Sequence, residues 1–257
     1  GKDSSELIQA DAVVLAVGVT GLKKIIQQSP SLANISPDLR RAAGSMKAID
    51  VIATRIWFDK KVNCPFPSNV FSEYSELEGA GGTFFCLDTL HDNPWGEEDN
   101  ANNKGTVVAA DFYNACNLMY LSDEEIKRRL VEVMLPSAVP SFKDAKVIDM
   151  WIKRFPQAVT HFAPGSASTR PPQKIPEIDN LVVAGDLVRG LEHGSAGLSQ
   201  ERAYVSGLAA GNQLIKSMGG NSAHEILATE GDEPQFKALK DFAQRSDRLL
   251  RAVRKQW

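Results

Sequence analysis

The stretch from residue 180 to residue 215 combines a carboxylate with glycines in a pattern that could bind a small molecule. Asp186 follows the apolar run "NLVVAG", which predicts a buried strand, and ligands bind at the carboxyl ends of strands in open α/β sheets. A carboxylate there can accept hydrogen bonds from ribose or ribityl hydroxyl groups. The alternative is structural: Gly185 and Asp186 form a turn, and the later glycines only permit close helix packing.

The second part of this stretch predicts a helix whose start could face a ligand. Gly194, Ser195 and Gly197 precede small and apolar residues that recur at helical spacing up to Leu214. The first N–H groups of that helix, near residues 196–199, have no partner within the helix and carry partial positive charge. The pattern therefore predicts a place for an anion or an electron-rich carbonyl group.

The composition is that of a globular protein. With 257 residues, 43% of them hydrophobic, the chain can form one large domain or two interleaved domains. Its formal net charge is −3, so no overall basic surface indicates nucleic acid as a partner. The longest apolar run, residues 12–19, is far shorter than the roughly 20 residues that cross a bilayer. The sequence thus predicts neither nucleic-acid binding nor a membrane span.

The cysteines and histidines predict neither a disulfide framework nor a metal site. Cys64, Cys86 and Cys116 lie far apart and form no C-x-x-C motif, which favours a reducing compartment and a protein that is not secreted. The four histidines show neither metal-ligand nor catalytic-triad spacing. The chain begins at Gly1 and shows no targeting segment, so we interpret it as part of a longer protein.

The order of the predicted elements indicates two interleaved parts. Apolar strands are predicted near both ends, in residues 12–18 and 180–186, and a helical pattern follows each. Between them, residues 46–111 alternate short runs rich in Val, Ile, Phe and Thr with Gly, Asn and Pro, which is typical of a largely antiparallel or mixed sheet. Ser36 followed by Pro37 predicts the start of one helix, and Ser122 and Glu125 form a capping box before another. The predicted fold class is α/β with mixed α+β features.

Residues between 147 and 186 form a pattern that is shared with a known family. They are Lys153, Pro156, Pro164-Gly165, Arg170-Pro171, Ile175-Pro176, Asn180-Leu181 and Ala184-Gly185-Asp186. This segment resembles the carboxyl-terminal part of plant and cyanobacterial phytoene and ζ-carotene desaturases, within the FAD-dependent amine oxidase superfamily. The similarity is close after residue 147 and extends loosely over residues 10–217.

The resemblance implies a partial Rossmann-like FAD-binding domain interleaved with a mixed-sheet substrate domain. Residues 1–44 are expected to form a late part of the FAD-binding domain and residues 45–160 the substrate domain. The chain is expected to return to the FAD-binding domain in residues 161–218, and residues 219–257 to form a basic tail.

FAD is the cofactor that the resemblance implies, and no metal is expected. In that family, a Gly-Asp segment followed by glycines and a Ser-Gly-x-x-Ala-Ala helix covers the flavin. The residues expected to bind the cofactor are Gly18, Gly185, Asp186, Gly194, Ser195, Ala196, Gly197, Leu198 and Ser199.

The resemblance also implies that the flavin N5 atom removes a hydride from a lipophilic polyene. Amine oxidases of the superfamily usually carry a lysine on the strand beneath N5, and that position falls on Ala53 or Thr54 here. A slip of two residues would bring Arg55 under the ring, and His193 could contact the flavin edge, so both are candidate catalytic residues. The alternative is that Arg55 is a surface charge at a strand end and that His193 is a loop histidine hydrogen-bonded to the backbone. The alternative functions are an amine oxidase and a non-catalytic relative.

Apolar residues on the predicted strands are candidate walls of a substrate tunnel, although such residues more often belong to the core. They are Ile56, Phe58, Phe84, Phe85, Phe112, Tyr113 and Trp151.

The chain lacks one motif that its resemblance leads us to expect. The superfamily holds the FAD pyrophosphate with a G-x-G-x-x-G turn, and none of the nineteen glycines has that spacing. We therefore expect a missing amino-terminal FAD-binding segment as a partner, and weak FAD binding by these 257 residues alone.

Residues 234–257 predict an amphipathic helix with seven Lys or Arg against two Asp, a local charge of +5. Such a helix can lie on an anionic membrane surface or pack on its own domain. For an enzyme with a lipophilic substrate, the expected location is a plastid or the cytoplasmic face of a photosynthetic membrane.

Overall fold

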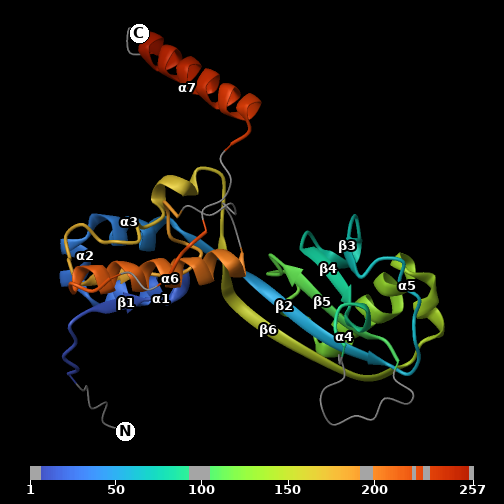
Figure 1. The fold of residues 1–257 in the computed structure, drawn as a ribbon. Coiled ribbons are helices and arrows are strands. Elements are labelled where there is room, and N and C mark those ends of the chain that lie inside the picture. Colours follow the sequence, from blue (N-terminus) through green and yellow to red (C-terminus); the bar gives the residue numbers. More distant parts are fainter. Residues whose placement is uncertain (1–6, 93–104, 192–198, 222–223, 228–231, 255–257) are drawn as a thin grey trace.

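The computed structural model describes residues 7–92, 105–191, 199–221, 224–227 and 232–254. They form a mostly helical body and a body built on a sheet, and two long strands join the two (Figure 1). The last helix projects away from both bodies (Figure 1). In this part of the chain, no helix has the length and apolar character needed to cross a membrane. The mixed α/β fold class predicted from the sequence is confirmed.

The helical body is layered around two parallel strands. Strand β1 (Val13–Leu15) pairs with β7 (Leu181–Val183). Because side chains alternate along a strand, Leu181 and Val183 pack into one core and Val182 into another. The helices of this body are α1 (Gly18–Gln28), α2 (Pro30–Ile35) and α3 (Pro37–Ser45) on the side of Leu181 and Val183, and α6 (Gln200–Ser217) on the side of Val182.

Strand β1 is less covered than its sequence predicts. We expected a buried strand, but Val13 and Val14 are 45% and 44% exposed. One edge of β1 pairs with β7, and no other described strand pairs with β1. The prediction of burial is therefore wrong for this part of the molecule, because an apolar run identifies a strand without identifying what covers it.

The sheet body contains five strands, and each pair of neighbours is antiparallel. Their order across the sheet is β3-β4-β5-β2-β6. The strands are β2 (Lys47–Phe58), β3 (Ser68–Phe71), β4 (Gly81–Cys86), β5 (Val107–Tyr113) and β6 (Val147–His161). A helical run covers one face, and it comprises α4 (Asp123–Lys127), a π-helical segment (Arg128–Met134) and α5 (Leu135–Ala138).

Strand β2 shows how the sheet divides its side chains between two faces. Ile52 and Ile56 are fully buried in the core beneath the helical run. The residues that alternate with this buried set, Ala53, Arg55 and Trp57, are only partly covered. Since side chains alternate along a strand, the sheet has one core face and one open face.

Polar contacts fix the sheet to the helical body where β6 bends. Gln157 has a positive φ of 48°, and the pairing of β2 with β6 shifts register between Ile49 and Val51. The Asp50 carboxylate accepts a hydrogen bond from the Gln157 N–H at 2.7 Å, and the Thr20 hydroxyl of α1 donates to the Gln157 carbonyl at 2.9 Å. This irregularity therefore sets the direction in which the long strands leave the helical body.

Two predicted helix starts are confirmed. The Ser36 side chain accepts the Leu39 N–H at the start of α3, and the Ser122 side chain accepts the Glu125 N–H at the start of α4. Helix α7 (Pro234–Arg254) starts at the proline that predicted it. The predicted domain boundaries, by contrast, stay predictions.

The expectation that the cysteines form no disulfide is wrong. Cys64 and Cys86 are disulfide-bonded, with Cα atoms 6.9 Å apart, and Cys116 is free and exposed. The loop before β3 brings Cys64 beside the end of β4, where Cys86 lies. A separation of 22 residues in sequence gave no indication of this proximity.

Candidate functional site

The parallel strands place Gly18, Gly185 and Asp186 beyond the same edge of their sheet. β1 ends just before Gly18 and β7 just before Gly185 and Asp186, and parallel strands present their carboxyl ends together. Gly185 has a φ of +127°, and a Cβ there would lie 2.7 Å from Leu187 Cδ2. The turn thus requires glycine, and it delivers Asp186 to the strand end.

Hydrogen bonds hold this turn against α6. The Gly185 N–H donates to Ser206 Oγ at 2.7 Å, and the Ser206 hydroxyl donates to the Ala203 carbonyl at 2.6 Å. Gln173 Nε2 donates to the Ser206 carbonyl at 2.7 Å. The serine is fully buried, so the position of the turn depends on α6.

Asp186 lies where the two bodies meet, in a partly buried and positively charged environment. Its Oδ1 accepts a hydrogen bond from the Thr160 hydroxyl near the end of β6, at 2.9 Å. Arg202 Nε donates to the Asp186 carbonyl at 3.0 Å, and its guanidinium also donates to the Val188 carbonyl. Arg170 stacks over the Phe162 ring, 4.3 Å from its centroid.

Burial is the largest influence on the pKa values of Arg170 and Arg202. It lowers the pKa of Arg170, and the charge of Arg202 lowers it further, whereas Asp186 raises it. Burial likewise lowers the pKa of Arg202, and Asp186 opposes the change. Both guanidinium groups thus lie close enough to Asp186 for its charge to raise their pKa.

The start of α1 offers backbone donors near this edge. No side chain caps the helix, whose N-cap position is Val17. Gly18 has a φ of +62°, and no heavy atom lies within 4 Å of the place where its Cβ would be. A bare helix start, a carboxylate with further acceptor capacity and two arginines fit the anionic groups and hydroxyls of a flavin dinucleotide.

The remaining predicted cofactor residues are described only in part. Ser199 caps α6, and its hydroxyl accepts the Arg202 N–H at 3.3 Å. The helix begins at Gln200, so its first free N–H groups follow Ser199 instead of lying in residues 196–199. The others, which are His193, Gly194, Ser195, Ala196, Gly197 and Leu198, lie outside the described residues.

Arg55 lies on the open face of the sheet, away from the Asp186 edge. There a hollow of about 340 Å³ has Arg55, Trp57, Asp111 and Trp151 in its walls. Its small side chains are Ala53 of β2 and Ala109 of β5, with the backbone near Thr54 also at its surface. Broad indole rings beside alanines leave room for an apolar molecule to lie on the sheet.

The strand register arranges the hollow in rows. Lys153, Ala53, Asp111 and Thr83 form one row across β6, β2, β5 and β4. The next row holds Trp151, Arg55, Ala109 and Phe85. Residues opposite each other in antiparallel strands share a face, so Lys153 and Asp111 flank the position at which amine oxidases were expected to carry lysine.

Asp111 is the half-buried carboxylate of this hollow. Burial raises the pKa of Asp111, and the nearby Arg55 guanidinium partly opposes that rise. Sequence reasoning missed Asp111, Trp57 and Lys153. Alternation along "VVAADFY" placed Asp111 opposite the core face, but its position beside Ala53 depends on strand pairing, which the sequence does not display.

The predicted tunnel walls divide between the two faces of the sheet. Phe85, Tyr113 and Trp151 are partly or largely exposed on the open face. The other four are core residues, at most 3% exposed, so their assignment to a tunnel is wrong: Ile56, Phe58, Phe84 and Phe112.

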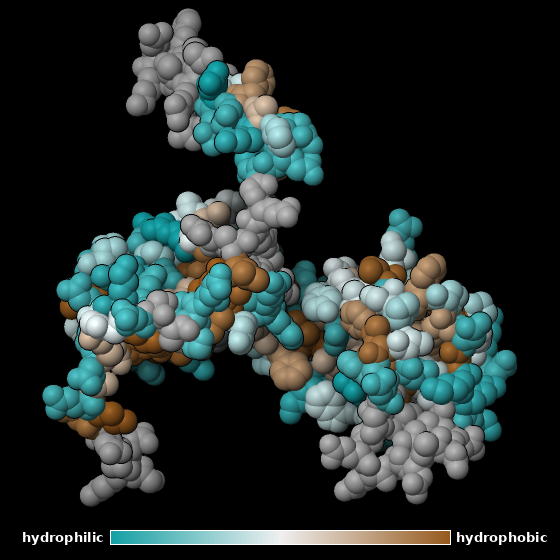
Figure 2. Space-filling view, viewed as in Figure 1, coloured by the Kyte–Doolittle hydropathy of each residue, from teal (hydrophilic) through white to brown (hydrophobic). Residues whose placement is uncertain are grey.

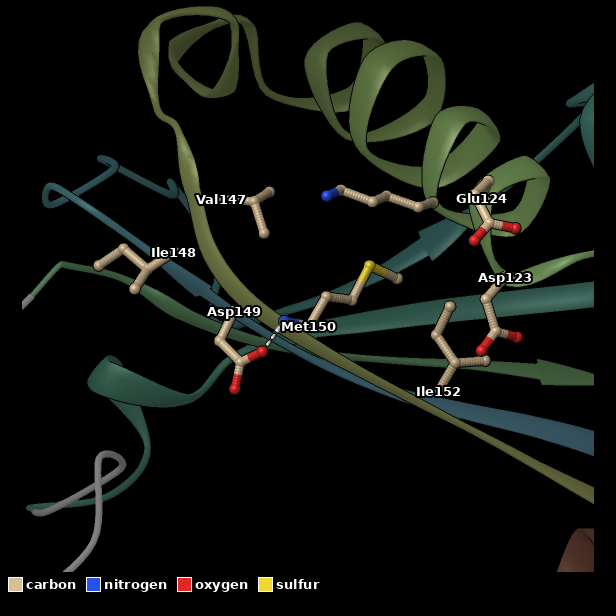
Figure 3. Close-up of a pocket in the computed structure, with 8 residues that line it drawn as sticks. Asp123, Glu124, Val147, Ile148, Asp149, Met150 and Ile152 are labelled. Atoms are coloured by element: carbon tan, nitrogen blue, oxygen red, sulfur yellow. Dashed lines mark hydrogen bonds between the residues drawn. The ribbon is translucent and has the colours of Figure 1, made fainter.

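A second hollow, of about 300 Å³, lies between the start of α4 and strand β6 (Figure 3). Asp123, Glu124 and Asp149 make its surface acidic. Asp123 forms an ion pair with Arg154 at 2.5 Å, and Asp149 accepts the Met150 N–H at 2.8 Å. These carboxylates thus have partners in the chain. Among the described residues, no group of three or more His, Cys, Asp or Glu could hold a metal ion.

Comparison with solved structures shows the fold. A candidate protoporphyrinogen oxidase from Exiguobacterium sp. 255-15 superposes with a TM-score of 0.50 at 15% identity, over 82% of this chain and 41% of that one. An oxidoreductase from Methanosarcina mazei gives a TM-score of 0.47 at 13% identity, over 79% of this chain and 43% of that one. The chain thus spans about two fifths of these proteins. No curated protein matches it.

A sequence model of one protein family matches residues 2–215 of the chain. Its description is flavin containing amine oxidoreductase, which agrees with the predicted cofactor, FAD. The matched region includes both the edge at Asp186 and the hollow at Ala53. The chain therefore belongs to the family of flavin containing amine oxidoreductases.

Proposed function

We propose that the protein is an FAD-dependent oxidoreductase that removes hydrogen from a lipophilic polyene, as carotenoid or isoprenoid desaturases and related isomerases do. The observation that carries the proposal is the hollow on the open sheet face, where Ala53 and Ala109 share the walls with Trp57 and Trp151. Ala53 is one of the two residues, with Thr54, on which the resemblance placed the lysine of amine oxidases. A flat, apolar chain can lie over alanines and against indole rings.

The residues of this chain would divide the work between two sites. The start of α1 at Gly18 would offer backbone donors to the cofactor, and the turn at Gly185 would present the Asp186 carboxylate, with positive charge from Arg170 and Arg202. Bound FAD would supply a hydride acceptor at N5. The hollow would orient the substrate.

A second candidate function is amine oxidation, and the register of β6 favours it. Lys153 lies directly opposite Ala53 on the same face, so a lysine is present one strand away from the expected position. A carboxylate at Asp111 and two tryptophans could also bind a cationic amine. Amine oxidation would depend on Lys153, whereas polyene desaturation would not.

Anaerobic flavin reduction tests the choice. The complete protein, loaded with FAD, is mixed with a lipophilic polyene or with a series of primary and secondary amines, and flavin absorbance is followed. We expect the polyene to bleach the flavin. We expect the rate of flavin reduction in the Lys153→Met variant to equal that in the parent. Lys143→Met, at an exposed lysine of the same body, is the control. Bleaching by amines alone, slowed by Lys153→Met and not by Lys143→Met, would contradict the proposal.

The cofactor site also leads us to propose a partner segment. A glycine-rich dinucleotide-binding segment outside these 257 residues would cover the exposed Val13 and Val14 of β1 and bind the pyrophosphate. Supplying that segment to the purified chain should raise its affinity for FAD. Equal affinity with and without it would count against the proposal.

We propose further that α7 rests on an anionic lipid surface, in a plastid or at the cytoplasmic face of a photosynthetic membrane. Its side chains include exposed Phe236, Leu239 and Phe242, and hydrophilic and hydrophobic surface both appear on it (Figure 2). The +5 charge of residues 234–257 favours acidic headgroups, and surface attachment would bring the enzyme to a lipid-soluble substrate.

A further inference from the structure

We infer that Asp111 accepts the proton that the substrate loses, and this inference rests on the proposed function. Conversion of a carbon–carbon single bond to a double bond removes a hydride from one carbon atom and a proton from its neighbour. The proton needs a base within reach of the substrate. Asp111 is the carboxylate in the wall of the hollow, opposite Ala53 in β2 and Thr83 in β4.

The surroundings of Asp111 suit a base better than a structural anion. No hydrogen bond to its carboxylate is present among the described residues. The carboxylates of Asp50, Asp123 and Asp186, by contrast, accept hydrogen bonds. Asp186, for example, accepts from Thr160, and Asp50 accepts from Gln157. Since a carboxylate freed of donors holds a proton more readily, the half-buried Asp111 has a raised pKa and is a stronger base than an exposed aspartate.

The charged groups that face Asp111 from the neighbouring strands are basic. Arg55 of β2 lies one row away and lowers the pKa that burial raises. Lys153 of β6 shares its row beyond Ala53, and Tyr113 is the titratable neighbour on β5 itself. β4 contributes only Thr83 opposite, which does not titrate. Two basic side chains and the Asp111 carboxyl group therefore lie near one another on this part of the open face.

The step balances without any further reactant. One carbon–hydrogen bond breaks, and bound FAD would accept the hydride with its two electrons. The neighbouring carbon–hydrogen bond breaks, its electron pair forms the second bond of the new double bond, and the proton goes to an Asp111 carboxylate oxygen. Neutral Asp111 then returns the proton to water, to which the half-exposed hollow is open.

A matched pair of variants of the complete FAD-loaded protein tests the role. Asp111→Asn removes the base, and Asp149→Asn removes an exposed carboxylate of β6 on the same sheet. We expect Asp111→Asn to slow flavin reduction at saturating polyene by on the order of 10²-fold or more, with little change in the substrate dissociation constant. We expect Asp149→Asn to react like the parent, and Asp111→Glu to recover part of the rate.

A second measurement does not depend on turnover. Carbon-13 NMR of the aspartate carboxyl groups in the cofactor-free protein should show one aspartate that titrates above the ordinary range and disappears in Asp111→Asn. Arg55→Met should raise that pKa further, because Arg55 lowers it. Absence of such a resonance would contradict the electrostatic basis of the inference.

The outcomes separate this inference from the proposed function. If polyene reduces the parent flavin and Asp111→Asn reacts at the parent rate across the pH range, Asp111 is not the base and the function stands. If polyene does not reduce the parent flavin while an amine does, the proposed function fails and the inference falls with it.

Discussion

Replacing Gly185 by alanine should destabilise the protein strongly, because two independent strains meet at this turn. The φ of +127° lies in a region that L-residues rarely adopt, which costs roughly 1–3 kcal/mol. The new Cβ would also lie 2.7 Å from Leu187 Cδ2. Leu187 is only 1% exposed and packs in the core of the helical body, so moving it adds roughly 1–3 kcal/mol of overpacking. We expect a total loss of about 2–6 kcal/mol.

Urea unfolding followed by circular dichroism measures this loss, and Gly207→Ala is the matched control. Gly207 lies inside α6, where no heavy atom is within 4 Å of a new Cβ and the backbone is helical. Alanine there should stabilise the protein by roughly 0.5–1 kcal/mol. If Gly185→Ala unfolds within about 0.5 kcal/mol of the parent, the argument that the turn requires glycine is refuted.

Other contacts give testable outcomes as well. Hydrogen bonds from Arg128 and Arg129 lower the pKa of Glu125 to about 2, so its ionised form stabilises the fold above its ordinary pKa and this contribution is lost as pH falls towards 2. Glu125→Gln should therefore lower the melting temperature at pH 7 and leave it unchanged at pH 2. Ser206→Ala should cost roughly 1–3 kcal/mol in urea unfolding, because it leaves the Gly185 N–H unpaired. Deleting residues 234–257 should abolish co-sedimentation with anionic vesicles; unchanged co-sedimentation would contradict the membrane proposal.

Local chemistry explains which parts of the fold could be predicted from the sequence. The caps at Ser36 and Ser122 are local signals, since donor and acceptor lie three residues apart, and both helices start as expected. The glycine before Asp186 likewise signalled a turn at a strand end. The apolar run at Val13 identified a strand, but its exposure depends on segments far away in sequence. The disulfide between Cys64 and Cys86 depends on such distant segments as well.

The candidate site was predictable only where alternation along one strand was sufficient. Phe84 and Phe85 are adjacent on β4, so their side chains point to opposite faces of the sheet; Phe84 is buried and Phe85 is partly exposed. The sequence alone therefore showed that both could not line the same tunnel. The position of Asp111 beside Ala53 is different, because it is set by the pairing of β5 with β2. A shift of one residue in that pairing would turn the carboxylate into the core, and nothing local in the sequence fixes the register.

Strand β6 connects the two candidate sites through one continuous element. Thr160, near its end, donates to the Asp186 carboxylate, and Lys153 lies in the row that contains Ala53. A strand advances about 3.3 Å per residue, so Lys153 and Thr160 are roughly 20 Å apart along β6. No single side chain bridges that distance. A ligand system that engages both sites must therefore be long, as a dinucleotide cofactor in contact with its substrate is, and the bend at Gln157 fixes the angle between the sites before any ligand binds.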